Sequence, residues 1–120
     1  MKLIIKGILP NLNEIFKASK SHYGSYSKMK AEYTELVAWE ARIQKIKHVE
    51  SADFVITWYM KNKRRNKDNI MAGQKFIFDG LQQAGVIKND GWKQLGDVTH
   101  KFAVDKKRPR VEVEILELSA

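Results

Sequence analysis

A run of charged and amide side chains, KNKRRNKDN, occupies residues 61–69 and combines two features suited to phosphate chemistry. Lysine and arginine recruit phosphate groups, and a nearby carboxylate such as Asp68 can hold a divalent cation. A second acidic position, Asp90, follows at the far end of the next predicted helix. Cations and carboxylates together favour chemistry on a phosphodiester over simple adhesion to one. The basic candidates for phosphate contacts are Lys61, Lys63, Arg64, Arg65 and Lys67.

Asp68 and Asp90 are the candidate metal ligands. Mg²⁺ prefers hard oxygen ligands, keeps several waters and bridges to substrate phosphate. If the two carboxylates lie close in space, they would share such an ion, which would stabilise developing charge and activate a water. Lys75 would then neutralise charge on the scissile phosphate or on the leaving oxygen.

A less specific interpretation of the same residues stays open. Asp68 would only cap a helix, and Asp90 would make local backbone bonds in the turn sequence KNDG. Lys75 would pair with Asp79 one turn along the helix, an exposed ion pair worth ~0.3 kcal/mol. Spacing alone does not decide between the two interpretations.

The composition indicates one small basic domain that covers residues 1–120. The net charge is +8 and the sequence pI is about 9.7, which favours polyanionic partners such as nucleic acid. A second basic cluster, suited to phosphate contacts, comprises Lys106, Lys107, Arg108 and Arg110.

Cysteine is absent, which excludes disulfides and thiolate metal sites. No apolar run approaches the ~18 residues of a membrane span, and the segment MKLIIKGILPN is too short and interrupted for a secretory signal. We therefore expect no membrane partner and a cytoplasmic protein.

The hydrophobic periodicity predicts an α+β fold in which two main helices pack on a small mixed β-sheet, in the order β-α-β-α-β-β. The second predicted helix begins near Asp68, and Gly85 ends it as a C-cap. Its apolar residues, from Ile70 to Ala84, fall within one ~80° arc that should pack on the sheet. The predicted strands span residues 3–9, 54–60, 96–105 and 111–117, the predicted helices span residues 28–47 and 68–83, and residues 11–27 form a loop with a short helical turn at 13–18.

Four segments together resemble the RusA family of Holliday-junction resolvases, in its phage-borne Gram-positive branch. They are LPNLNE, KRRNKDNI, KFIFDGLQQAGVIKNDG and DKKRPRVEVEI, and they cover nearly the whole chain in the same order. The resemblance implies a small α+β fold, a homodimer, and paired nicking of four-way DNA junctions that depends on Mg²⁺, with Mn²⁺ as a substitute. It thus implies a crossover junction endodeoxyribonuclease that acts in DNA recombination and repair.

The resemblance also assigns roles to single residues. The family's D-x-D-N motif falls on residues 66–69, its helix lysine on Lys75 and its later acid on Asp90, which makes these the implied catalytic residues together with Asp68. The early asparagine of the family's N-terminal loop falls on Asn13, which joins the implied DNA contacts. One position departs from the pattern, because the first motif aspartate is Asn66 here.

Asn66 keeps the shape of aspartate and loses its charge, so it remains a neutral and weaker metal ligand. Three explanations stay open: a deliberately introduced inactivating substitution, natural drift toward a junction-binding but slow protein, or compensation by Asp79 or Asp97. We favour some loss of cleavage with binding retained. The alternative function is therefore a junction-binding protein with little or no cleavage activity. A small transcription regulator is a third class, although no helix-turn-helix pattern is present.

Two further residue types have predicted structural roles. His100 falls on the apolar face of a predicted strand, which favours a hydrogen-bonded core residue over a metal ligand. The three tryptophans, Trp39, Trp58 and Trp92, are predicted to anchor the core or a dimer interface.

Overall fold

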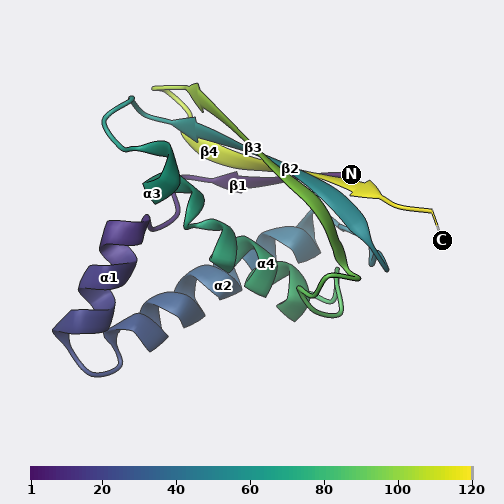
Figure 1. Ribbon diagram of the computed structural model, residues 1–120, viewed down its shortest axis with the longest axis horizontal. Coiled ribbons are helices and arrows are strands. Elements are labelled where there is room, and N and C mark those ends of the chain that lie inside the picture. Colours follow the sequence, from purple (N-terminus) through teal and green to yellow (C-terminus); the bar gives the residue numbers. More distant parts are fainter. Residues whose placement is uncertain (120) are drawn as a thin grey trace.

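In the computed structural model, which describes residues 1–119, four strands form one mixed sheet, and helices cover one of its faces (Figure 1). The predicted α+β class and mixed sheet are confirmed. The elements in chain order are β1 (Lys2–Lys6), α1 (Leu12–Ser21), α2 (Ser25–Ile43), β2 (Ala52–Met60), α3 (Lys67–Met71), α4 (Gln74–Gln83), β3 (Leu95–Val104) and β4 (Arg110–Glu117).

The strand order in the sheet is β1-β4-β2-β3. Strand β2 pairs with β3 in parallel and with β4 antiparallel, and β1 pairs antiparallel with β4. A parallel pair needs a crossover connection, which α3 and α4 provide between β2 and β3. The carboxyl ends of β2 and β3 therefore lie at the same end of the sheet, and β3 is an edge strand.

Alternation along the central strand builds the core. Every second residue of β2, from Ala52 to Met60, is buried beneath the helices, and the residues between them are only half-buried on the open face. Trp58 and Phe54 are the largest fully buried side chains. The predicted apolar arc is confirmed at Ile70, Ile77 and Leu81, which are all buried.

The predicted element order is wrong in two places. The first is residues 11–27, where the predicted short helical turn at 13–18 is part of a full helix, α1, and where α2 already begins at Ser25. Asn11 is the N-cap of α1: its side chain accepts from the Glu14 N–H, and Glu14 accepts from the Asn11 N–H. This N-x-x-E sequence is a capping box built on asparagine, a start signal that the hydrophobic period does not reveal.

The second error is the continuous helix predicted over residues 68–83. It is broken at Ala72 and Gly73 into α3 and α4. A Cβ atom at Gly73 would lie 3.1 Å from both Leu9 Cβ and the Trp58 ring. At this break the backbone of Gly73 lies directly against the core residues Leu9 and Trp58, where a larger residue would have little room. The predicted end of this unit is confirmed, because α4 ends at Gln83 and Gly85 has a φ of +79°.

Helices α2 and α4 cross at close range. A Cβ atom at Gly80 would lie 2.5 Å from Val37 Cβ and 3.0 Å from the Thr34 carbonyl oxygen. Only glycine allows α4 to pack at this distance, so Gly80 fixes how closely α4 approaches α2. No helix within residues 1–119 is both long and apolar enough to cross a bilayer.

Candidate nucleic-acid interface

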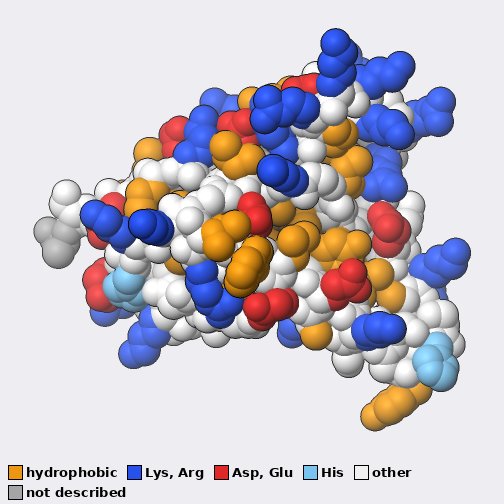
Figure 2. Space-filling view, turned by 180° about the vertical axis from the view of Figure 1, so that it is seen from behind, with side chains coloured by type: hydrophobic (Ala, Val, Ile, Leu, Met, Phe, Trp, Pro, Cys, Tyr) orange, Lys and Arg blue, Asp and Glu red, His pale blue; other side chains and the backbone are white. Residues whose placement is uncertain are grey.

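The two basic clusters of the sequence meet at one end of the sheet. The first follows the carboxyl end of β2, and the second follows the carboxyl end of β3. Because Met60 and Val104 are neighbours in the parallel ladder, the segments after them leave the sheet side by side. Figure 2 shows lysine and arginine side chains gathered at this end of the molecule. We call this surface the basic end, and it comprises Lys61, Lys63, Arg64, Arg65, Lys67, Lys106, Lys107 and Arg108.

Most cations of the basic end are free to meet phosphate. Within residues 1–119, Lys61, Lys63 and Arg64 form no ion pair. Arg65 Nη1 lies 3.4 Å from Glu14 Oε1, and this ion pair joins the loop to the first turn of α1. Asn13 is exposed in the same turn. The structure therefore brings Asn13 to the side of the basic end, as the predicted DNA contacts require.

Arg110 differs from the other predicted DNA contacts. Its guanidinium lies 2.8 Å from Asp105 and 2.7 Å from Glu112, and it stacks 3.8 Å from the centre of the Tyr59 ring. Hydrogen bonds from Arg110 lower the pKa of both carboxyl groups. The side chain of Arg110 is largely covered on the open face of the sheet. We correct the prediction: Arg110 orders the β3–β4 turn and is not a free phosphate contact.

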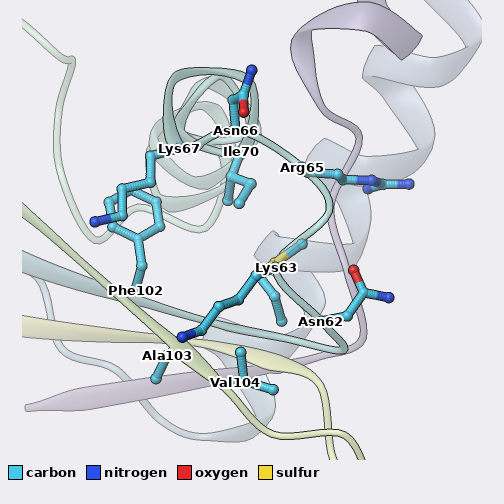
Figure 3. A pocket seen from close by; sticks show the side chains of 10 residues that line it. Asn62, Lys63, Arg65, Asn66, Lys67, Ile70, Phe102, Ala103 and Val104 are labelled. Atoms are coloured by element: carbon cyan, nitrogen blue, oxygen red, sulfur yellow. The ribbon is translucent and has the colours of Figure 1, made fainter.

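A cavity of about 440 Å³ opens within the basic end (Figure 3). Its walls include the apolar side chains of Met60, Ile70 and Phe102, and its rim includes Lys63 and Lys67. Lys67 Nζ lies 5.4 Å from the centre of the Phe102 ring, which is within range of a cation–π contact. The cavity therefore combines an apolar floor with positive charge. Sequence reasoning missed Phe102 as a site residue, although its place near the carboxyl end of β3 was the available signal.

Asn66 and Asp68 lie at the start of α3, and Asn66 lines this cavity. Asn66 is the N-cap residue, in extended conformation, and its side chain makes no capping bond. The expectation that Asp68 is the N-cap is therefore wrong, because the N-cap position lies two residues earlier, at Asn66. Asp68 lies in the first turn, and its Oδ1 accepts from the Asn69 N–H at 3.0 Å. Both side chains are exposed, so their remaining oxygen atoms can reach a hydrated cation or solvent.

Asp90 does not join Asp68 within one chain. Asp90 lies in the loop that precedes β3, at the amino ends of β2 and β3, whereas Asp68 follows their carboxyl ends. Eight residue steps of β2 separate those two ends, which corresponds to about 26 Å. No group of three or more potential His, Cys, Asp or Glu metal ligands occurs within residues 1–119. The expectation of one ion shared by both carboxylates of a single chain is therefore wrong.

The contacts of Lys75 agree with the less specific interpretation, in which this residue pairs with Asp79 one turn along the helix. Its Nζ lies 3.9 Å from Asp79 Oδ2, and Lys30 of α2 approaches the same oxygen at 3.9 Å. Asp79 is thus positioned between two lysines at the α2–α4 contact. Lys75 is held on this side of α4, and the structure gives it no contact with Asp68.

His100 is confirmed as a hydrogen-bonded residue of the sheet. The Trp58 indole N–H donates to His100 Nδ1 at 2.9 Å, and His100 Nε2 lies 3.1 Å from Gln74 Oε1. This pattern places the proton on Nε2, which donates to Gln74. Burial lowers the pKa of His100, so the ring is neutral at pH 7.

The three tryptophans have different environments. Trp58 is buried, as predicted for a core residue, but Trp39 is 55% exposed and Trp92 is 100% exposed. Neither Trp39 nor Trp92 belongs to the core, which leaves an interface role as the remaining part of that prediction.

In comparisons with known proteins, no family model matches the chain and no curated protein matches it. The likeness to the RusA family is thus carried by the sequence motifs alone.

Proposed function

We propose that this protein binds four-way DNA junctions and cleaves them as a Mg²⁺-dependent, RusA-like crossover junction endodeoxyribonuclease. The observation that carries the proposal is the convergence of two basic clusters and a cavity at the end of the sheet where α3 begins, with Asp68 in the first turn of that helix. A junction presents dense phosphate on four arms, which suits a surface rich in free lysine and arginine.

The metal site would be centred on Asp68 and the side-chain oxygen of Asn66. Both residues belong to the start of α3, and both are exposed beside the cations that would hold the DNA strand. A Mg²⁺ or Mn²⁺ ion bound there would polarise the scissile phosphate and supply an activated water. Because Asp90 and Asp68 lie beyond opposite ends of β2, a strand about 26 Å long, Asp90 would have to reach this site from a second copy.

A homodimer suits this substrate. A two-fold-symmetric dimer presents two identical sites, and a four-way junction needs two symmetric cuts. The proposed working form is therefore a cytoplasmic homodimer.

The second candidate function is a junction-binding protein with little or no cleavage. The observation that favours it is Asn66, which places a neutral amide where the motif carries a carboxylate. The basic end would still bind phosphate, because none of its cations depends on the charge at position 66.

A cleavage assay separates the two functions. The protein is incubated with a synthetic four-way junction and with a linear duplex, in Mg²⁺, in Mn²⁺ and in EDTA. Asp68→Asn tests the metal site, and Glu32→Gln, an exposed change of the same charge on α2, is the matched control. We expect metal-dependent symmetric nicks that Asp68→Asn abolishes and Glu32→Gln preserves.

Two other results of this assay would indicate a different function. A salt-sensitive junction complex with intact strands in every metal would assign the binding function. Preference for a particular sequence in the linear duplex would refute both and indicate a transcription regulator.

A further inference from the structure

Helix α2 has a second apolar face, which points away from the core. Its first apolar face packs inward, and Val37 on that face lies against Gly80 of α4. At about 100° per residue, Leu36, Trp39 and Ile43 lie on the opposite side of the helix. These three side chains are 38%, 55% and 52% exposed. Single exposed apolar residues are ordinary, but several in a row on one helix indicate a surface that another molecule covers.

The spacing of this second face is that of a coiled-coil seam. The half-buried Met29 is seven residues before Leu36, Ile43 is seven residues after it, and Trp39 follows Leu36 by three. In a heptad repeat these are a and d positions, whose side chains pack against a second helix. From Met29 to Ile43 the helix rises about 21 Å, which accommodates roughly four turns of another helix. We call this row the outer stripe, and it comprises Met29, Glu32, Leu36, Trp39 and Ile43.

The surroundings of the outer stripe are acidic in a strongly basic protein. Residues 31–41 contain three glutamates and no lysine or arginine, whereas the whole chain has a net charge of +8. A groove of about 370 Å³ lies on the stripe, and its walls include Glu32, Glu35 and Trp39. Negative charge beside an apolar wall repels phosphate, so this surface does not suit DNA. It suits an apolar ligand that carries positive charge.

Glu32 offers a free carboxylate within the outer stripe. Within residues 1–119 it forms no ion pair. Glu35 differs, because it pairs with Arg42 at 3.3 Å and accepts a hydrogen bond from Gln83. Glu32 follows Met29 by three residues and so occupies a d position, where a second helix would pass closest. A lysine or arginine of that helix would therefore meet an unpaired carboxylate between apolar contacts.

We propose that the outer stripe binds an amphipathic helix of another protein, with apolar side chains on Leu36, Trp39 and Ile43 and a lysine or arginine on Glu32. An apolar helix face laid into an apolar groove is a recurring mode of peptide recognition. An exposed tryptophan suits the centre of such an interface, because its ring buries a large area and loses little conformational entropy. The stripe shares no residue with the basic end, so this inference does not depend on the proposed function.

Two synthetic peptides of three heptads test the charge that the site selects. Both carry leucine at the a and d positions, and they carry either lysine or glutamate at the flanking e and g positions. The net charge of +8 would favour the acidic peptide, whereas the outer stripe would favour the basic one. We expect the basic peptide to bind at least about tenfold more tightly, by fluorescence anisotropy in about 150 mM salt. Equal binding, or a preference for the acidic peptide, would overturn the proposal.

Substitutions on α2 test where the basic peptide binds. Trp39→Ala removes the apolar anchor and Glu32→Lys reverses the free charge, so each should raise the Kd of the basic peptide about tenfold. Trp92→Ala, which removes a fully exposed tryptophan outside the stripe, is the matched control and should keep the parent Kd. Circular dichroism checks that the variants fold, and Glu32→Lys, at an exposed position, keeps the test decisive if Trp39→Ala loses stability. An unchanged Kd for Glu32→Lys would contradict the predicted charge contact.

The oligomeric state of the protein alone separates a foreign helix from a second copy of this chain as the occupant. Analytical ultracentrifugation compares the parent protein with Glu32→Lys and Trp39→Ala. We expect the same oligomeric state for all three, which leaves the outer stripe free for the peptide. An oligomer that both substitutions dissociate would assign the stripe to contact between copies and would overturn the proposal.

Discussion

The salt dependence of junction binding gives a direct measure of the basic end. The triple variant Lys106→Ala/Lys107→Ala/Arg108→Ala removes three cations from the β3–β4 turn. It leaves Arg110 and its ion pairs with Asp105 and Glu112 in place, so the turn keeps its anchor. Within residues 1–119 none of the three replaced side chains forms an ion pair, and the fold should tolerate their loss.

The expected magnitude follows from counterion release. Each phosphate contact adds about 0.9 to the slope of log K against log salt concentration for duplex DNA, so three contacts contribute about 2.7. Between 50 and 200 mM salt, the variant should therefore lose about 40-fold less affinity than the parent protein. Its affinity at low salt should fall, because those contacts are absent.

Fluorescence anisotropy with a labelled four-way junction in EDTA measures both slopes without cleavage. The matched control, Lys28→Ala/Lys45→Ala/Lys47→Ala, removes the same net charge from exposed positions on and just after α2. We expect the control to keep the parent slope. Equal slopes for the two triple variants would refute the basic end as the DNA-binding surface, because total charge alone would then account for binding.

Three further predictions follow from single contacts. Gly80→Ala should lower the free energy of unfolding by about 1–3 kcal/mol in urea titrations, because its Cβ would lie 2.5 Å from Val37 Cβ; unchanged stability would show that α2 and α4 can separate without cost. Asn66→Asp should raise Mg²⁺-dependent junction nicking roughly tenfold or more by restoring a charged ligand, and equal rates for both forms would contradict a metal role at this position. Arg110→Ala should reduce the fall of the melting temperature as the pH drops below neutral. In the folded protein Asp105 and Glu112 have lowered pKa values, so their ion pairs with Arg110 stabilise the folded protein above the ordinary carboxyl pKa. This stabilisation is lost as the pH falls through the lowered pKa values. An unchanged pH profile for that variant would show that the ion pairs do not stabilise the turn.

Sequence periodicity predicted the strands and the apolar face of α4 because these depend on local alternation and helical spacing. It predicted only a short helical turn at 13–18 in place of α1, because the signal of α1 is a capping box rather than a hydrophobic repeat, and it missed the break at Gly73. That break depends on contact with Leu9 and Trp58, which are distant in the sequence. No pattern within a single segment reports such a contact.

The candidate site shows the same division. The two clusters of lysine and arginine could be recognised in the sequence, because their members are close along the chain. Their meeting at one end of the sheet depends on the parallel pairing of β2 and β3, which no local pattern reports. The expected approach of Asp68 and Asp90 failed for the same reason, since the crossover places them at opposite ends. Arg110 was counted as a free cation because its partners Asp105 and Glu112 lie across a turn and along a strand.

The hydrogen bonds of His100 to Trp58 and to Gln74 make the contact between α4 and β3 sensitive to mild acid. If His100 were protonated on both nitrogens, its Nδ1–H would face the Trp58 indole N–H, and two donors would meet. The folded protein therefore disfavours protonation of His100, in the same direction as the burial that lowers the pKa of this residue. The stabilisation is complete above the ordinary histidine pKa of about 6.5 and declines as the pH falls below it. A weakly acidic buffer would therefore loosen the first turn of α4 from the sheet before the carboxylates begin to titrate.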